Sequence, residues 1–221
     1  MPAIGLIPRL LGIVLLSLVF IAMTIAVAAG AFRTLDLQVA EAMRDAWQPG
    51  LHPLFQVIAE LGSLELTSVL MLALTVYLWR SGFGSDALVF IVFIAAQLFE
   101  LYYKLNLPHL QPPRSIAEAD GPSITQLFAG DGFGNSFPSG HVIRAVIVYG
   151  LLAFVIHRLS TSPRVRTLAI AGSIVIIGLV SIDRLYLDVH WESDVIGGLL
   201  LGAIALLAGT VWLDRPRKAQ N

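Results

Sequence analysis

The chain has 221 residues, of which 57% are hydrophobic and 13% are charged, and its mean hydropathy is +0.80. Soluble domains carry roughly 25% charged residues, so this composition indicates a membrane protein. The net charge of −1, from 14 basic and 15 acidic residues, provides no basic field that would attract nucleic acid. The chain contains no cysteine, which excludes disulfides, thiolate metal sites and cysteine nucleophiles.

Six apolar stretches are long enough, or nearly so, for a bilayer span of about 20 residues. They are Leu10–Ala31, Ser63–Leu78, Ala87–Tyr102, Val142–Ile156, Leu168–Ile182 and Val195–Leu213. The first resembles a secretory signal peptide, but its uncharged run to Phe32 exceeds the roughly 7–15 residues of a signal core. We therefore expect it to be retained. The sequence predicts an all-α, polytopic protein in which residues 1–221 form a single domain with six transmembrane helices.

Residues 34–48, between the first two spans, are predicted to form a short interfacial helix. The apolar side chains that share one face of this segment are Leu37, Val39, Ala40, Met43 and Trp47. An amphipathic helix of this kind lies flat in the membrane interface. Pro49, Gly50 and Pro53 are then expected to end this helix before the second span.

The distribution of basic residues predicts the orientation of the protein in the membrane. Six spans place both termini on one side, together with Arg9, Arg80, Arg158, Arg164, Arg166, Arg215, Arg217 and Lys218. On the opposite side, only Arg33 and Arg44 lie away from the motifs described below. The positive-inside rule then places the termini in the cytoplasm. The outward-facing loops are Thr34–Gly62, Leu105–His141 and Arg184–Asp194.

The first motif is Pro138-Ser-Gly-His141, which directly precedes the apolar run that begins at Val142. Ser139 suits the N-cap position of a helix, and Gly140 lets the backbone approach an anion closely. The free N–H groups and the dipole at a helix N-terminus favour a phosphate there. His141 would then be placed to protonate a departing alcohol oxygen. Taken alone, the motif is also compatible with a simple turn followed by an interfacial histidine.

The second motif runs from Arg184 to Asp194, between the last two spans. The planar guanidinium of Arg184 suits bidentate contact with phosphate oxygens. Asp194 follows His190 at i+4, and a carboxylate bonded to one ring nitrogen fixes the tautomer and leaves the other nitrogen free to attack. The alternative is a cluster satisfied by local ion pairs. A zinc site made of His141, His190 and Asp194 is conceivable but lacks a recognisable short ligand motif, so we expect no metal and no cofactor.

Together these segments resemble the type 2 phosphatidic acid phosphatase superfamily, which shares its active site with vanadium haloperoxidases. The signature of that family is Lys-x6-Arg-Pro, then Pro-Ser-Gly-His, then Ser-Arg-x5-His-x3-Asp. The second element is complete at 138–141, and the third appears as Arg184, His190 and Asp194 with the expected spacing. The matching motifs lie at the outer ends of the third to sixth spans.

The chain departs from this signature at two places. Lys104 keeps its position at the end of the third span, but Gln111-Pro112 stands where the family has Arg-Pro. Arg114, three residues later, either replaces the missing phosphate clamp or is a solvated loop arginine. Asp183 stands where the family has serine, and its carboxylate either holds the guanidinium of Arg184 or weakens anion binding by repulsion.

The resemblance implies an integral membrane phosphatase that hydrolyses a lipid phosphate or diphosphate of the phosphatidic acid, phosphatidylglycerol phosphate or undecaprenyl diphosphate class. It implies a phosphohistidine on His190, oriented by Asp194, with His141 as the acid and base. The implied phosphate-binding residues are Lys104, Arg114, Ser139, Gly140 and Arg184. The loop 105–141 is expected to carry part of the site. Two alternatives stay open, a lipid phosphotransferase that uses the same site and a non-catalytic homologue that binds or moves lipids.

Three further features outside these motifs carry weaker expectations. Three histidines have no evident partners and are expected to lie on the surface: His52, His109 and His157. Arg144, one turn after His141, either contacts substrate or pairs with an acid of the outer loop. Gly198-x-x-x-Gly202 favours close helix packing, within the bundle or between subunits. Neither the lipid nor the oligomeric state follows from the sequence.

Overall fold

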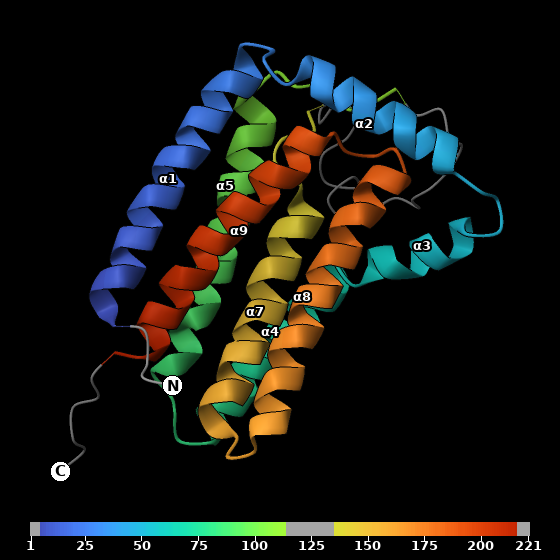
Figure 1. Cartoon of the computed structure of the whole chain (residues 1–221). Coiled ribbons are helices and arrows are strands. Elements are labelled where there is room, and N and C mark those ends of the chain that lie inside the picture. The colour runs from blue at the N-terminus through green and yellow to red at the C-terminus, as the bar shows by residue number, and fades with distance from the viewer. Residues whose placement is uncertain (1–4, 114–134, 216–221) are drawn as a thin grey trace.

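The computed structural model describes residues 5–113 and 135–215, and this part of the chain is helical, with a single isolated β-bridge between Leu110 and Asn135 (Figure 1). Its elements are α1 (Leu6–Ala28), α2 (Arg33–Ala46), α3 (His52–Glu60), α4 (Leu64–Arg80), the 3-10 turn η1 (Asp86–Val89), α5 (Phe90–Asn106), α7 (Gly140–Leu159), α8 (Pro163–Tyr186) and α9 (Glu192–Leu213). Six segments are long and apolar enough to cross a membrane, with α3 and α4 counted together as the second. The prediction of an all-α protein with six transmembrane helices is confirmed.

Two helices, α2 and α3, lie between α1 and α4, and α3 is continuous with the second candidate span, His52–Arg80. The helix predicted at 34–48 is α2, which ends at Ala46, and α3 follows after a short turn. In Figure 1, α2 lies across the end of the bundle and α3 runs sideways from it towards α4. Pro53 lies in the first turn of α3, where a helix does not need the missing N–H. The interfacial helix does end before Pro49 and Gly50, as predicted, and Pro53 belongs to the start of the next helix.

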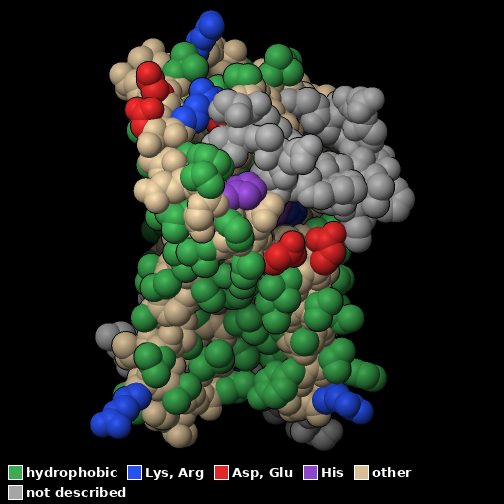
Figure 2. Space-filling view, turned by 90° about the vertical axis from the view of Figure 1, so that its right-hand side faces the viewer, with side chains coloured by type: hydrophobic (Ala, Val, Ile, Leu, Met, Phe, Trp, Pro, Cys, Tyr) green, Lys and Arg blue, Asp and Glu red, His purple; other side chains and the backbone are tan. Residues whose placement is uncertain are grey.

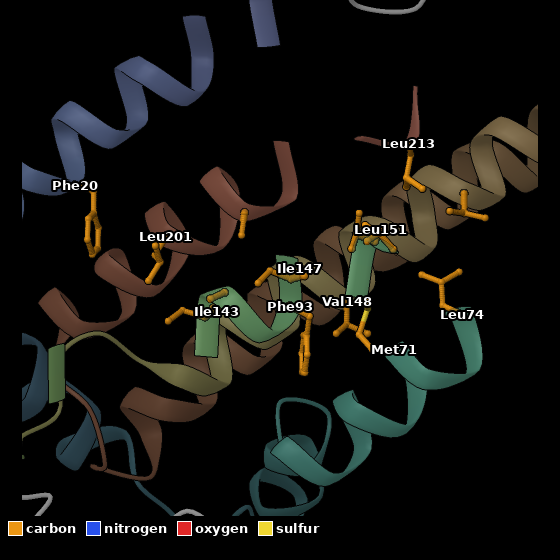
Figure 3. Close-up of a cluster of buried hydrophobic side chains, with 14 of the residues drawn as sticks. Phe20, Met71, Leu74, Phe93, Ile143, Ile147, Val148, Leu151, Leu201 and Leu213 are labelled. Carbon is orange, nitrogen blue, oxygen red and sulfur yellow. The ribbon is translucent and has the colours of Figure 1, made fainter. Parts of the chain in front are cut away.

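Helix α7 forms the centre of the bundle, with α8 and α9 packed along it and α1 packed outside α9 (Figure 1). Apolar residues occupy almost every side of its first three turns, and a helix that is apolar all round is stable only when it is buried. Figure 3 shows the resulting core, in which Phe20 of α1, Met71 of α4, Phe93 of α5 and Leu201 of α9 surround Ile147.

Two glycines of α9 set its distance from α7. A Cβ atom at Gly198 would lie 2.8 Å from the carbonyl oxygen of Ser139, and one at Gly202 would lie 2.7 Å from the Cβ atom of Val146. Small residues at this spacing let two helix backbones approach closely. The Gly198-x-x-x-Gly202 pattern therefore acts within the bundle, and it fixes the start of α9 against the turn that precedes α7.

The two ends of the bundle differ in charge. On the face shown in Figure 2, hydrophobic side chains cover the middle, basic side chains mark the lower end, and charges of both signs mark the upper end. At the end where α1 begins and α9 ends, Arg9 pairs with Asp214 at 2.6 Å, and Asp86 lies 3.3 Å from both Arg158 and Arg215. The arrangement is that of a multi-pass membrane protein.

Candidate active site

The predicted site residues gather at the end of the bundle where α5 and α8 end and α7 and α9 begin. His141 lies close enough to His190, Arg184 and Lys104 for each of these groups to act on it electrostatically. The backbone N–H of Ser139 donates to the carbonyl of Asp194 at 3.0 Å, which joins the two motifs directly. Arg114 lies outside the residues that the structure describes.

His190 is held by Asp194 as the spacing predicts. Its Nδ1 lies 3.1 Å from Oδ2 of Asp194, and the backbone N–H of Trp191 donates to the same oxygen at 2.9 Å. Asp194 is fully buried at the start of α9. Because a carboxylate only accepts hydrogen bonds, Nδ1 of His190 carries the proton, and in the neutral ring Nε2 has the lone pair.

The pKa of His190 is lowered from its ordinary value, chiefly because the ring is buried. The hydrogen bond and the charge of Asp194 act in the opposite direction, and the positive charges of Lys104 and Arg184 lower the pKa further. The neutral, nucleophilic form of the imidazole is thereby favoured near neutral pH.

The Pro138-Ser-Gly-His141 turn leads directly into α7. Ser139 is the N-cap residue, as predicted, but its side chain makes no capping hydrogen bond. Its Oγ is buried and has no hydrogen-bond partner among the described residues, although buried hydroxyl groups are normally satisfied. The hydroxyl therefore lies available to a ligand at a helix N-terminus, where an anion is favoured.

His141 is contacted by a buried arginine. Nη2 of Arg144 lies 3.3 Å from Nδ1 of His141, and Arg144 also donates to the carbonyl of Gly62, to Gln97 and to Glu100. Since a guanidinium only donates, Nδ1 of His141 is the acceptor and its Nε2 carries the proton. Arg144 thus pairs with an acid of α5, and the acids of the outer loop 105–141 lie outside the described residues.

Glu100 balances two of the cations in the site. One of its oxygens lies 2.7 Å from Nζ of Lys104, and the other lies 3.3 Å from Arg144. Its carboxylate is buried and packs against Gly140, occupying the space that a Cβ atom there would fill. Gly140 is therefore required at this position because a side chain would collide with Glu100.

Arg184 is buried at the end of α8, and its Nε and Nη2 donate to the same oxygen of Asp183 at 2.8 and 2.5 Å. The carboxylate that replaces the family's serine therefore holds the guanidinium. The carbonyl of Arg184 also accepts from the backbone N–H groups of Val189 and His190, each at 3.3 Å, which shapes the loop that carries His190.

His109 is not a surface histidine, contrary to the sequence-based expectation. Its Nε2 lies 3.3 Å from Oδ1 of Asp194 and 3.3 Å from Oγ of Ser193. Ser193 in turn donates from its backbone N–H and its hydroxyl to the two oxygens of Asp36, each at 2.9 Å. The sequence signal for this cluster was weak, namely a polar Asp36 on the otherwise apolar side of α2 and a histidine between Lys104 and the prolines.

Two further contacts join α2 and the residues just after it to the end of α8 and the loop of His190. Arg44 makes a bidentate pair with Asp188, at 3.0 and 3.1 Å, and the backbone N–H of Gln48 donates to the hydroxyl of Tyr186 at 2.8 Å. Asp188 is buried and has a φ of 55°, a conformation in which an aspartate is tolerated better than most residues. Helix α2, predicted to lie on the membrane surface, thus also contacts the residues that flank His190.

The chain is similar in sequence to known proteins. The chain is 32% identical over 148 residues to "Putative undecaprenyl-diphosphatase YbjG" of Escherichia coli strain K12, covering 66% of this chain and 67% of the relative. It is 27% identical over 192 residues to phosphatidylglycerophosphatase B of Bacillus subtilis strain 168, covering 86% and 88%.

A solved structure shares the fold. It is a transmembrane PAP2-type phosphatidylglycerolphosphate phosphatase from Bacillus subtilis, with a TM-score of 0.79 and 24% identity, and the match covers 94% of this chain and 98% of that one. The family model described as the PAP2 superfamily matches residues 87–218, the region that contains both motifs. The chain therefore belongs to the PAP2 superfamily.

Proposed function

We propose that this protein is a lipid phosphatase that works through a phosphohistidine on His190. The observation that carries the proposal is the bond between Nδ1 of His190 and buried Asp194, which leaves Nε2 as a nucleophile beside Lys104 and Arg184. A nucleophile, an orienting carboxylate and cations for a developing charge are the groups that phosphoryl transfer requires.

The reaction has two steps. In the first, Nε2 of His190 attacks phosphorus, the bond from phosphorus to the lipid oxygen breaks, and His141, acting as an imidazolium, supplies a proton to that oxygen and becomes neutral. In the second, His141 takes a proton from water, the resulting hydroxide attacks phosphorus, and the bond to Nε2 breaks to release phosphate. With a diphosphate, the leaving oxygen belongs to the inner phosphate.

Phosphate is bound in this proposal by Lys104, Arg184, the Ser139 hydroxyl and the backbone at Gly140, with Arg114 as a further ligand. The unsatisfied Ser139 hydroxyl at the N-terminus of α7 supports this assignment. These groups neutralise the equatorial oxygens as charge develops. Cationic side chains thus take the part that magnesium takes in many phosphoryl transfers, and we propose that the reaction needs no metal.

The membrane setting and the names of the relatives support a proposal for the substrate class. One relative is named for undecaprenyl diphosphate and another for phosphatidylglycerophosphate, so we propose a substrate of this kind or phosphatidic acid. We further propose that residues 1–221 act as one unit, that α2 lies in the membrane interface, and that the loop 105–141 forms part of the site. The site would face away from the cytoplasm, with both termini inside, as the basic end of the bundle supports.

Phosphate release from a panel of lipid mono- and diphosphates by purified protein in detergent tests the proposal. Wild-type protein should release phosphate, should stay active in EDTA and should be inhibited by vanadate, whereas His190→Ala should be inactive but folded. Transfer of phosphate to an added alcohol would favour the phosphotransferase alternative. Tight lipid binding without turnover would favour the non-catalytic alternative and overturn the proposal.

A further inference from the structure

We propose that His109 is a positioning residue for the nucleophile, which holds the second oxygen of the Asp194 carboxylate while His190 bonds to the first. The inference rests on the proposed function for its catalytic meaning, since it concerns how His190 is kept ready to attack. His109 belongs to no element of the family signature, because it falls among the unspecified residues after Lys104.

Distances place His109 against the carboxylate of Asp194. Its Nε2 lies 3.3 Å from Oδ1 of Asp194, and its side chain is only 17% exposed. Oδ1 is buried and accepts no hydrogen bond among the described residues, so the 3.3 Å contact with His109 is an ion-pair distance. A buried carboxylate oxygen without a donor is costly, and the imidazole of His109 is the polar group that faces this oxygen.

The neighbouring serine settles which way the imidazole proton points. The Ser193 hydroxyl gives its single proton to Oδ2 of Asp36 at 2.9 Å, so only its lone pairs face Nε2 of His109. Asp194 also offers only lone pairs. Two acceptors on the same ring nitrogen require a proton there, and His109 is therefore the Nε2–H donor in this cluster.

The backbone around His109 is fixed on both sides. Its N–H donates to the side chain of Asn135 at 3.0 Å, and its carbonyl accepts from the N–H and hydroxyl of Ser136 at 2.8 and 3.1 Å. The edge of its ring meets the ring of Phe137, with the planes at 89°. The amide of Asn135 also donates to the carbonyl of Lys104 at 2.9 Å.

These hydrogen bonds, together with the contact between His109 and Asp194, connect the proposed phosphate-binding lysine to the proposed nucleophile. The connection runs from Lys104 through Asn135 to His109, and from there through Asp194 to His190. Groups that orient a ligating or catalytic residue from behind are worth roughly 10- to 100-fold in function when they are removed. We expect an effect on kcat and little effect on KM, because His109 acts through Asp194.

Three substitutions distinguish the loss of the N–H donor of His109 from a change in the size of its side chain. His109→Leu removes the donor, His109→Gln returns an amide N–H near the place of Nε2, and His109→Asn places its amide near Nδ1 instead. We expect kcat to fall about tenfold or more in the Leu and Asn variants, with most of it regained in the Gln variant. His157→Leu, at the opposite end of α7, is the matched control and should keep the wild-type kcat.

A second readout does not depend on turnover. In protein labelled with ¹⁵N-histidine, the nitrogen shifts of His190 should show a single tautomer protonated at Nδ1 in the wild type and in His109→Gln. In His109→Leu they should show a mixture of tautomers, with unfolding temperatures measured for every variant.

The two readouts keep the hypotheses apart. If wild-type protein releases no phosphate from any lipid, the proposed function fails while the nitrogen shifts still decide the role of His109. Unchanged His190 shifts in His109→Leu would overturn the inference. A kcat in His109→Gln as low as in His109→Leu, at equal thermal stability, would overturn it as well.

Discussion

His190 and His141 are the same residue type, but their Nδ1 atoms face groups of opposite charge. The carboxylate of Asp194 requires a proton on Nδ1 of His190, and the guanidinium of Arg144 requires a lone pair on Nδ1 of His141. The two rings therefore present different atoms at Nε2, a lone pair on His190 and an N–H on His141. The lone pair at Nε2 of His190 matches the proposed role of nucleophile. The neutral ring of His141 donates a hydrogen bond through Nε2, and the proposed proton transfer requires its imidazolium form, in which Nδ1 no longer accepts from Arg144.

The pH dependence of activity should report the environment of His190. Burial lowers its pKa, so its neutral form persists below the ordinary histidine value of about 6.5, and the acid limb of kcat/KM should lie below that pH. Asp194→Asn removes the hydrogen bond to a charge that raises this pKa. The limb should therefore move to lower pH in this variant, while kcat itself falls. A limb that moves to higher pH would contradict the assignment.

Arg144 should be important for stability as well as for the site. Arg144→Ala leaves the buried carboxylate of Glu100 with Lys104 as its remaining partner, and breaking a buried pair costs about 3 kcal/mol or more. The unfolding temperature in detergent should fall accordingly, and replacing both Glu100 and Arg144 by glutamine should recover part of the loss. Arg80→Ala, at an exposed position at the end of α4, is the control and should change little.

At the level of whole elements, α2 and the start of α9 form the frame for the nucleophile loop. Asp36 binds Ser193 after the loop, and Arg44 binds Asp188 within it. These partners lie 157 and 144 residues apart in the chain. The amphipathic pattern of α2 predicted its existence and its orientation, but a surface helix with a buried aspartate is recognised only once the partner is known.

The close approach of α7 and α9 leads to a prediction about two glycines. Gly198→Ala and Gly202→Ala each place a methyl group within 2.8 Å of α7 or of the turn before it, and overpacking of this kind costs about 1–3 kcal/mol. Both should lower the unfolding temperature. Gly198→Ala should also lower kcat, because the carbonyl that it meets belongs to Ser139. Gly172→Ala in α8 meets no atom within 4 Å and should be neutral or slightly stabilising.

Across the whole molecule, the sequence predicted the spans and the chemical motifs well. Hydropathy located all six spans, and the spacing of His190 and Asp194 predicted their bond, because both features are local in the chain. The contacts of His109 and Arg144 were missed because they join segments 84 and 44 residues apart. Local periodicity carries no information about which distant side chains meet.

The orientation of the bundle in the membrane can be tested without background labelling, since the chain has no cysteine. Asp45→Cys lies on an exposed position of α2, and Thr161→Cys lies in the turn between α7 and α8, at the other end. In intact cells, a membrane-impermeant maleimide should label Asp45→Cys and not Thr161→Cys. Labelling of Thr161→Cys alone would invert the proposed topology.

The carboxylate of Glu100 partly neutralises two of the positive charges in the site. Lys104 and Arg144 share this carboxylate in the structure. Under the proposed function, a phosphate that binds there would compete with Glu100 for these two cations, and its affinity would be the difference between two sets of ion pairs. We therefore expect weak binding of the inorganic product and stronger attraction for the more highly charged transition state.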